Sequence, residues 1–102
     1  MTTKMFVVIR NDTETSPIAQ ACHAVSQYLI DYSDRKGWRN GTVVVLQASE
    51  DRFMDLIVEL ELARASYSFF EEPDIGNEIT ALSCIGHDEL FKRFELVNAP
   101  LA

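Results

Sequence analysis

The chain has 102 residues, of which 47% are hydrophobic and 25% charged, and its formal net charge is −7. This length suits one hydrophobic core and is too short for two ordinary domains, so we expect a single domain over residues 1–102. The acidic balance argues against a broad phosphate-binding surface, because nucleic-acid affinity depends on basic side chains. No apolar run approaches the ~20 residues of a membrane span, and the start lacks a signal-peptide pattern, so we expect a cytoplasmic protein without a membrane partner.

The first half of the chain predicts a strand, a helix and a second strand. Residues 4–10 form a β-branched and aromatic run, typical of a strand buried on both faces. Ser16 is a good N-cap and Pro17 a good first residue for a helix that continues to about residue 32. Residues 42–48 form a second continuous apolar strand. The helix residues that we expect to face the sheet are Ile18, Ala21, Cys22, Val25, Tyr28 and Leu29.

The second half predicts a helix, two strands and a short helix. Ser49 is a plausible N-cap for a helix that ends near Arg64 and carries an apolar stripe. Residues 66–72 and 78–85 are typical of two strands, and the turn-forming residues between them predict a hairpin. A last helix is expected over residues 88–96, followed by a frayed tail.

These elements predict an α/β fold with one four-stranded mixed sheet flanked by helices. Strand–helix–strand units give parallel strands with right-handed crossovers. The fourth strand returns antiparallel, so the expected strand order is 2-1-4-3. The end of the first strand, the start of the first helix and the loop over residues 73–77 then share one pole of the sheet, where α/β proteins usually bind ligands.

A polar stripe lies on the first predicted helix. Gln20, His23 and Gln27 fall within about 60° of one another at ~100° per residue. The stripe is either part of a functional site or a solvated face. His23 also allows two interpretations. In the functional one it donates a proton or contacts RNA; in the structural one it lies beneath a neighbouring loop and its ring donates a hydrogen bond to a backbone carbonyl.

Charged residues at the same pole also allow two interpretations. Asp74 is either a functional carboxylate or a cap for the turn at Gly76. Arg10 either contacts phosphate or forms an ion pair with Asp12 at the rim of the sheet.

The remaining reactive residue types predict no cofactor and no metal. Cys22 and Cys84 have neither zinc-type nor redox-type spacing, so we expect both to be buried apolar residues. Trp38 lies in a loop with basic neighbours and is expected to seal the core, with a nucleic-acid patch as the alternative. We find no phosphate-cradling glycine loop and no catalytic Ser-His-Asp spacing.

Three segments, VVIRND, IAQACHA and EPDIGNEITALSCIG, resemble in this order the signature segments of type 2 peptidyl-tRNA hydrolases. The similarity runs over roughly residues 4–90. That family has a four-stranded mixed sheet covered by helices, and it cleaves the ester that joins a peptide to tRNA. The resemblance therefore implies peptidyl-tRNA or a tRNA end as partner, and hydrolysis of that ester as activity.

The first-helix segment matches the family pattern in part. Gln20, His23 and Ala24 match, whereas Ser16 stands where the family has a lysine. A lysine at that position would bind phosphate or stabilise the negative charge that develops on the carbonyl oxygen. Losing one such preorganised group costs ~100 to 1000-fold in rate.

The second segment also departs from the family. Asp74 and Gly76 match, but Asn77 and Glu78 stand where arginine and threonine are expected. Thr80 falls on a family threonine only when a gap is introduced. Glu78 adds negative charge where a phosphate would approach.

By this resemblance, the expected catalytic residues are Asp74, Gln20 and His23. Asp74 orients the attacking water, and Gln20 positions the ester. His23 contacts phosphate or the oxyanion, and Arg10 is a second candidate for that contact. The alternative function is a non-catalytic module that uses the same pocket for a tRNA end, a nucleotide or a protein partner. A third is an adaptor that binds a partner through the edge strand around Phe69 and Phe70, with the pocket left vestigial. A homodimer is a separate alternative for the partner. The expected substrate-binding residues are Arg10, Asp12, Ser16, Asn77 and Thr80.

Overall fold

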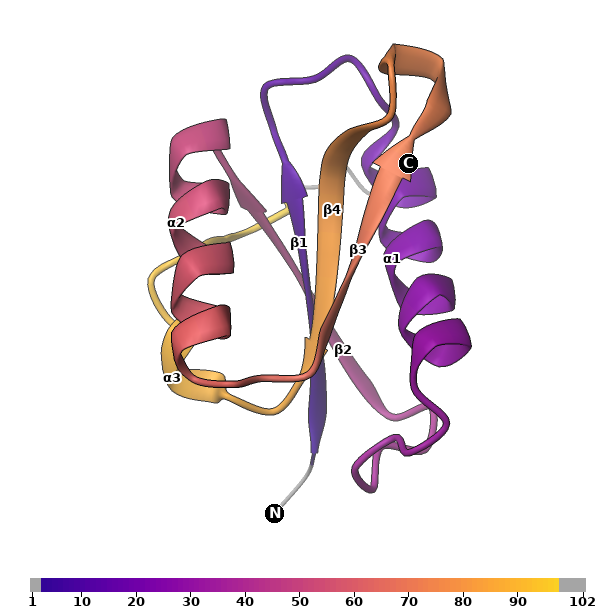
Figure 1. Cartoon of the computed structure of the whole chain (residues 1–102), viewed down its shortest axis with the longest axis vertical. Helices are drawn as coiled ribbons and strands as arrows, with labels where there is room; N and C mark the ends of the chain where they lie inside the picture. Colours follow the sequence, from indigo (N-terminus) through magenta and orange to yellow (C-terminus); the bar gives the residue numbers. More distant parts are fainter. Residues whose placement is uncertain (1–2, 98–102) are drawn as a thin grey trace.

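The computed structural model describes residues 3–97 and consists of a mixed sheet with helices on both faces (Figure 1). Helix α1 covers one face, and helices α2 and α3 cover the other. The α/β class and the flanking helices are as predicted. The elements in chain order are β1 (Lys4–Arg10), α1 (Pro17–Asp31), β2 (Thr42–Ala48), α2 (Glu50–Leu62), β3 (Tyr67–Glu72), the 3₁₀ helix η1 (Pro73–Ile75), β4 (Glu78–Ile85), α3 (Asp88–Phe91) and β5 (Glu95–Leu96).

The sheet has five strands in the order β3-β4-β1-β2-β5. Strand β1 runs parallel to β2 and antiparallel to β4, and β3 pairs antiparallel with β4. The predicted order of four strands is therefore confirmed, read from the opposite edge. The predicted number is wrong because β5 adds to the free edge of β2, where Leu46 pairs with Leu96.

The last predicted helix is also wrong in its length. Helix α3 ends at Phe91, whereas the prediction continued it to residue 96. Strand pairing displaces the helix here because the backbone of β2 offers hydrogen bonds at its open edge: the Val97 amide donates to the Val45 carbonyl at 3.0 Å. Phe91 and Phe94 nevertheless reach the core. The predicted frayed tail lies outside the described residues.

Helix α1 packs only in part with the predicted face: Tyr28 is buried, and Ala21, Val25 and Leu29 pack against the α1-side core. Its buried residues are Gln20, Ala24 and Tyr28, whereas Ile18 is 71% exposed and Cys22 is exposed. The expectation that Cys22 is buried is wrong. Relative to the predicted orientation, the helix is rotated so that Gln20 faces the sheet. This orientation is stable because the sheet has polar groups beneath the helix that form hydrogen bonds with it.

Those partners come from β4. The Ser83 hydroxyl donates to the Ala24 carbonyl at 2.7 Å, and the Thr80 hydroxyl donates to the side-chain oxygen of Gln20. Cys84, on the same strand, faces the other side and is buried as predicted; burial raises the pKa of its thiol to about 11.

Trp38 seals the α1-side core, as expected. It is buried, and its indole Nε1 donates to the Thr42 carbonyl at 3.0 Å. The Trp38 loop lies at the opposite pole from Asp74, so the two cannot form one surface. None of the helices formed by residues 3–97 has the length and apolar character needed to cross a bilayer.

Candidate functional site

The N-terminal end of α1 and the segment around η1 border a hollow of about 470 Å³, which we call the site hollow. The two segments meet at one end of the sheet, at the top of Figure 1. Four residues predicted for the site border it together: Ser16, Gln20, His23 and Asp74. The other residues lining the site hollow are Glu14, Thr15, Ala19, Glu72 and Ile75.

Ser16 begins α1. Its hydroxyl accepts a hydrogen bond from the Ala19 amide at 3.4 Å, and Pro17 follows at the first helical position. The residue at the position of the family lysine is therefore a helix cap. A serine supplies a hydroxyl to the site hollow but no positive charge.

Gln20 forms a buried wall of the site hollow. Its side chain is 2% exposed and accepts the hydroxyl hydrogen of Thr80, which is completely buried. This bond fixes the first turn of α1 to β4 across 60 residues of chain. The interpretation of Gln20 as a solvated residue is wrong. Thr80 does not line the site hollow itself; it holds the Gln20 side chain through this hydrogen bond.

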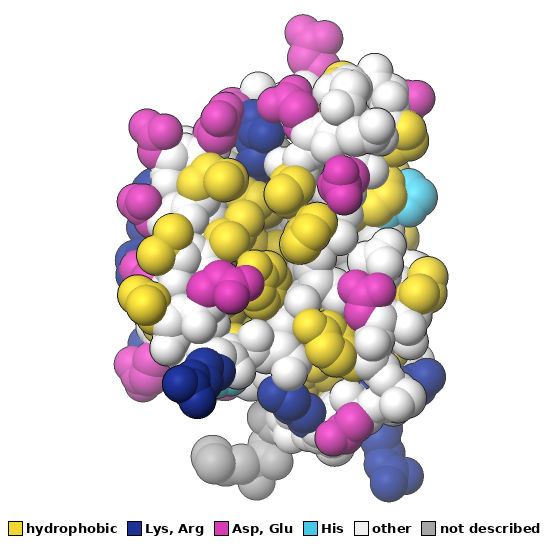
Figure 2. Space-filling model, viewed as in Figure 1, with side chains coloured by type: hydrophobic (Ala, Val, Ile, Leu, Met, Phe, Trp, Pro, Cys, Tyr) yellow, Lys and Arg dark blue, Asp and Glu magenta, His cyan; other side chains and the backbone are white. Residues whose placement is uncertain are grey.

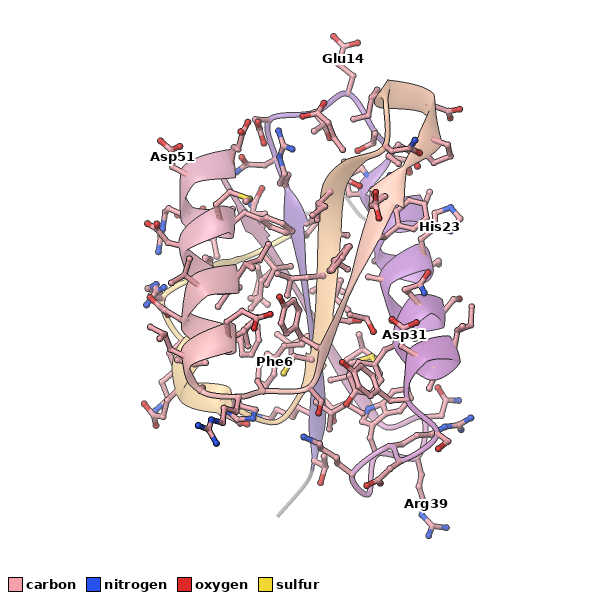
Figure 3. All side chains as sticks on the ribbon, viewed as in Figure 1. Phe6, Glu14, His23, Asp31, Arg39 and Asp51 are labelled. Carbon is pink, nitrogen blue, oxygen red and sulfur yellow. The ribbon has the colours of Figure 1, made fainter. Side chains whose placement is uncertain are left out.

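His23 lies at the rim. Its ring stacks on Phe70 of β3, with ring centroids 4.3 Å apart and planes 8° from parallel. The side chain is exposed on α1 (Figure 3), so the interpretation of His23 as held by a backbone carbonyl beneath a loop is wrong. Gln27, the third residue of the polar stripe, instead donates to Asp31 at 2.9 Å.

Asp74 projects from η1 and is exposed. The turn is closed by backbone groups, with the Asn77 amide donating to the Glu72 carbonyl at 2.9 Å. Gly76, with φ +74°, supplies the left-handed residue that ends η1. Within residues 3–97, no hydrogen bond engages the Asp74 carboxylate, so it does not cap this turn. Asn77 lies in the turn and does not line the site hollow.

Arg10 does not line the site hollow and is engaged by carboxylates. Its side chain is only 7% exposed and pairs with Asp12 at 2.8 Å, Glu50 at 3.0 Å and Glu78 at 3.3 Å. It also donates to the Ile79 carbonyl at 3.2 Å. These contacts raise the pKa of Arg10, and its hydrogen bonds hold the pKa of Asp12 below the usual value. Arg10 therefore forms the ion pair with Asp12 and has no free face for a phosphate.

The charge around the site hollow is negative. Glu14, Glu72 and Asp74 contribute carboxylates, and the lining drawn from residues 3–97 contains neither lysine nor arginine. Figure 2 shows acidic side chains gathered at this end of the molecule. Such a lining accepts hydrogen bonds from cations and repels phosphate. No group of three or more His, Cys, Asp or Glu side chains within residues 3–97 is arranged to hold a metal ion.

Contacts between distant segments were not predicted from the sequence. The stacking of His23 on Phe70 is one of them, although the odd-even alternation along β3 places Phe70 on the α1 side. The ion pair of Arg10 with Glu50 is another, because the two residues lie 40 residues apart. A search for carboxylates at the N-terminus of the second helix, next to the end of β1, would have suggested that pair.

Comparisons with known proteins support the fold. No protein-family model matches the chain, and no curated protein matches it. Among solved structures, the chain is similar to a protein of unknown function from Agrobacterium tumefaciens, with a TM-score of 0.73 and 13% sequence identity. The similarity covers 96% of this chain and 99% of that one. At this identity the likeness extends to the fold alone.

Proposed function

We propose that the site hollow is a non-catalytic binding site for a positively charged segment of a protein partner. The observation that carries this proposal is the negative lining, in which Glu14, Glu72 and Asp74 are opposed by no lysine or arginine within the described lining. Carboxylates form strong, charge-assisted hydrogen bonds with ammonium and guanidinium groups. A phosphate or nucleotide would meet like charge instead.

The dimensions support the insertion of a side chain. The volume of about 470 Å³ falls within the range of ordinary binding pockets. Ala19 and Ile75 supply apolar surface, against which the methylene stem of a lysine or arginine packs while its head reaches Asp74. Ser16 and Thr15 add hydroxyl groups at the same rim.

Binding of a short lysine-containing peptide is expected to depend on Asp74. We expect Asp74→Asn to raise the dissociation constant about threefold to tenfold, because an exposed ion pair contributes about 0.2–1 kcal/mol and a hydrogen bond to the charge adds to it. Affinity for the peptide should fall as salt rises. A titration followed by the NMR signals of His23 and Gly76 measures both effects.

Asp51→Asn is the matched control for this titration. Asp51 is also exposed, but it lies on α2, away from the site hollow (Figure 3). Adenosine monophosphate serves as the second probe and should leave both signals unmoved. The proposal fails if the nucleotide binds in the site hollow. It also fails if Asp51→Asn lowers the affinity for the peptide as much as Asp74→Asn does.

Hydrolysis of peptidyl-tRNA is the second candidate function. It is favoured by one observation: Asp74, Gln20 and His23, which the resemblance assigns to the site, border the same hollow. In this role Asp74 orients a water molecule toward the ester carbonyl, and the exposed His23 contacts the negative charge that develops. The reaction lacks a positive group because Arg10 is occupied by carboxylates. One missing stabilising donor costs ~100 to 1000-fold in rate.

An assay with peptidyl-tRNA distinguishes the two candidates. We expect peptide release by the purified chain to stay at the background level, equal to that of an Asp74→Ala variant. Release above background that disappears in the variant would identify an enzyme and contradict the non-catalytic proposal. Gel-shift titration with the same tRNA measures binding separately from hydrolysis. We expect no binding, because the lining of the site hollow is negatively charged.

A further inference from the structure

The loop between α1 and β2 concentrates positive charge in an acidic chain. Arg35, Lys36 and Arg39 are close neighbours in the sequence, and all three side chains are exposed. None of them forms an ion pair within residues 3–97. The loop lies at the pole opposite Asp74, and Figure 2 shows several basic side chains at this end of the molecule. This surface is therefore separate from the site hollow and opposite to it in charge.

The surface of this loop is concave. A volume of about 560 Å³ lies against residues 33–40, and we call it the loop hollow. Arg35 and Arg39 line it with guanidinium groups, which carry several hydrogen-bond donors each. Ser33 adds a hydroxyl group and Asn40 a side-chain amide. The loop hollow thus brings positive charge and neutral donors to one place.

The backbone of the loop is held in one conformation by its own contacts. The Lys36 amide donates to the Asp34 carboxylate at 3.0 Å, and the Trp38 amide donates to the Arg35 carbonyl at 2.8 Å. Lys36 and Gly37 have φ values of +49° and +82°, so the chain turns sharply between the two arginines. The buried Trp38 ring attaches this turn to the core. The arginines therefore project from a fixed backbone, which lowers the entropy cost of binding.

The charge of the loop hollow favours an anion. Asp34 is the one carboxylate in the part of the lining that residues 3–97 provide, and Arg35 and Arg39 outweigh it. Lys36, next in the chain, adds a third positive charge nearby. A guanidinium group donates two parallel hydrogen bonds to phosphate oxygens, so a pair of arginines suits a phosphate group better than a pair of lysines would.

Two observations favour a small ligand over a nucleic acid. The Trp38 ring is only 4% exposed, so it offers no face on which a base could stack. The chain as a whole carries a net charge of −7, so a long polyanion would bring its remaining phosphates close to carboxylates. The favourable charge is confined to the one loop, which matches a single phosphate or diphosphate group.

We infer that the loop hollow binds the phosphate group of a small ligand, either a phosphate monoester or a diphosphate. Arg35 and Arg39 bind the phosphate oxygens through their guanidinium groups, and Ser33 and Asn40 donate to oxygens that the arginines leave free. Lys36 attracts the ligand at longer range. This inference does not depend on the proposed function of the site hollow, because the two hollows lie at opposite poles.

An NMR titration of the full chain with pyrophosphate tests this site. We expect a saturable shift of the Gly37 amide signal, whereas the signals of His23 and Gly76, which report on the site hollow, stay in place. The dissociation constant should rise between ~20 mM and ~150 mM salt, because salt screens exposed charges. A Gly37 signal that does not move, or pyrophosphate binding at the site hollow, would overturn the inference.

A double variant, Arg35→Gln with Arg39→Gln, tests the assigned residues. Neither arginine side chain forms a hydrogen bond or an ion pair within residues 3–97, so the variant keeps the loop conformation. We expect the dissociation constant for pyrophosphate to rise at least about tenfold, because both bidentate donors are lost.

Arg64→Gln is the matched control for the double variant. Arg64 is also exposed and forms no ion pair within the same residues, but it follows α2, on the other face of the sheet. Its replacement should change the dissociation constant by less than about twofold. An effect as large as that of the double variant would mean that the anion responds to overall charge alone, and would overturn the inference.

A comparison of ligands tests the chemical class. We expect ribose 5-phosphate and adenosine monophosphate to shift the Gly37 signal with dissociation constants within about twofold of each other, because no aromatic ring is available to the base. A short single-stranded RNA should bind no more tightly than pyrophosphate. Tighter binding of the RNA would assign the loop to nucleic acid and contradict the proposed ligand class.

Discussion

Replacement of Arg10 by methionine is expected to lower the free energy of unfolding by about 2 kcal/mol at neutral pH. Removing one partner of a buried ion pair costs about 3–5 kcal/mol, because the remaining charge loses its counterpart. The cost is smaller here because Asp12, Glu50 and Glu78 keep contact with water, even though the Arg10 side chain is only 7% exposed. Equilibrium unfolding in urea measures the difference.

The same substitution is expected to change the response to acid. In the folded protein the pKa of Asp12 is held below its usual value, chiefly by the hydrogen bonds from Arg10. The resulting stabilisation is present above the unfolded pKa of about 3.9 and is lost as the pH falls through the folded pKa. The difference in unfolding free energy between wild type and Arg10→Met should therefore shrink below about pH 4.

Arg39→Met is the matched control for this experiment. Arg39 is exposed at the opposite pole of the molecule (Figure 3), and it forms no ion pair within residues 3–97. Its replacement should change the unfolding free energy by less than about 0.5 kcal/mol. Equal effects of the two substitutions on the unfolding free energy would contradict the prediction. They would show that the ion pairs of Arg10 do not stabilise the fold.

The parts of the fold that the sequence predicted are those determined by local pattern. The apolar runs over 4–10 and 42–48 are strands at the predicted positions, because both lie in the interior of the sheet, between other strands. Strand β5 was missed because two residues carry no periodic signal. Its existence depends on the open edge of β2, which lies about 50 residues earlier in the chain.

The candidate site, like the fold, was predictable where it depends on the order and direction of the elements, and not where it depends on contacts between distant side chains. Chain direction alone predicted that Asp74 lies beside the first turn of α1, and the structure places them around one hollow. The orientation of Gln20 could not be predicted from hydrophobic periodicity, because its partner Thr80 belongs to a distant strand. Arg10 shows the same limit: Asp12 is a neighbour in sequence, whereas Glu78 lies 68 residues away.

Substitution of Thr80 by valine is expected to lower the free energy of unfolding by about 1–3 kcal/mol. Valine has nearly the shape of threonine, so the packing of β4 is preserved. The side-chain oxygen of Gln20 then loses its donor while it remains buried at 2% exposure, and a buried unsatisfied group carries its full desolvation cost. Gln20→Leu is expected to have a similar effect, because it leaves the Thr80 hydroxyl without a partner. Urea unfolding of both variants measures these costs.

The double variant, Gln20→Leu with Thr80→Val, separates the hydrogen bond from the packing. Because it removes both polar partners, we expect it to be more stable than the sum of the single changes implies, by at least about 1 kcal/mol. Thr42→Val is the matched control, since this exposed threonine on β2 forms no side-chain hydrogen bond to residues 3–97 and its replacement should be nearly neutral. Strict additivity in the cycle would mean that the two side chains act independently. In that case the first turn of α1 would be held to the sheet by apolar packing, and the Gln20 wall of the site hollow would not depend on Thr80.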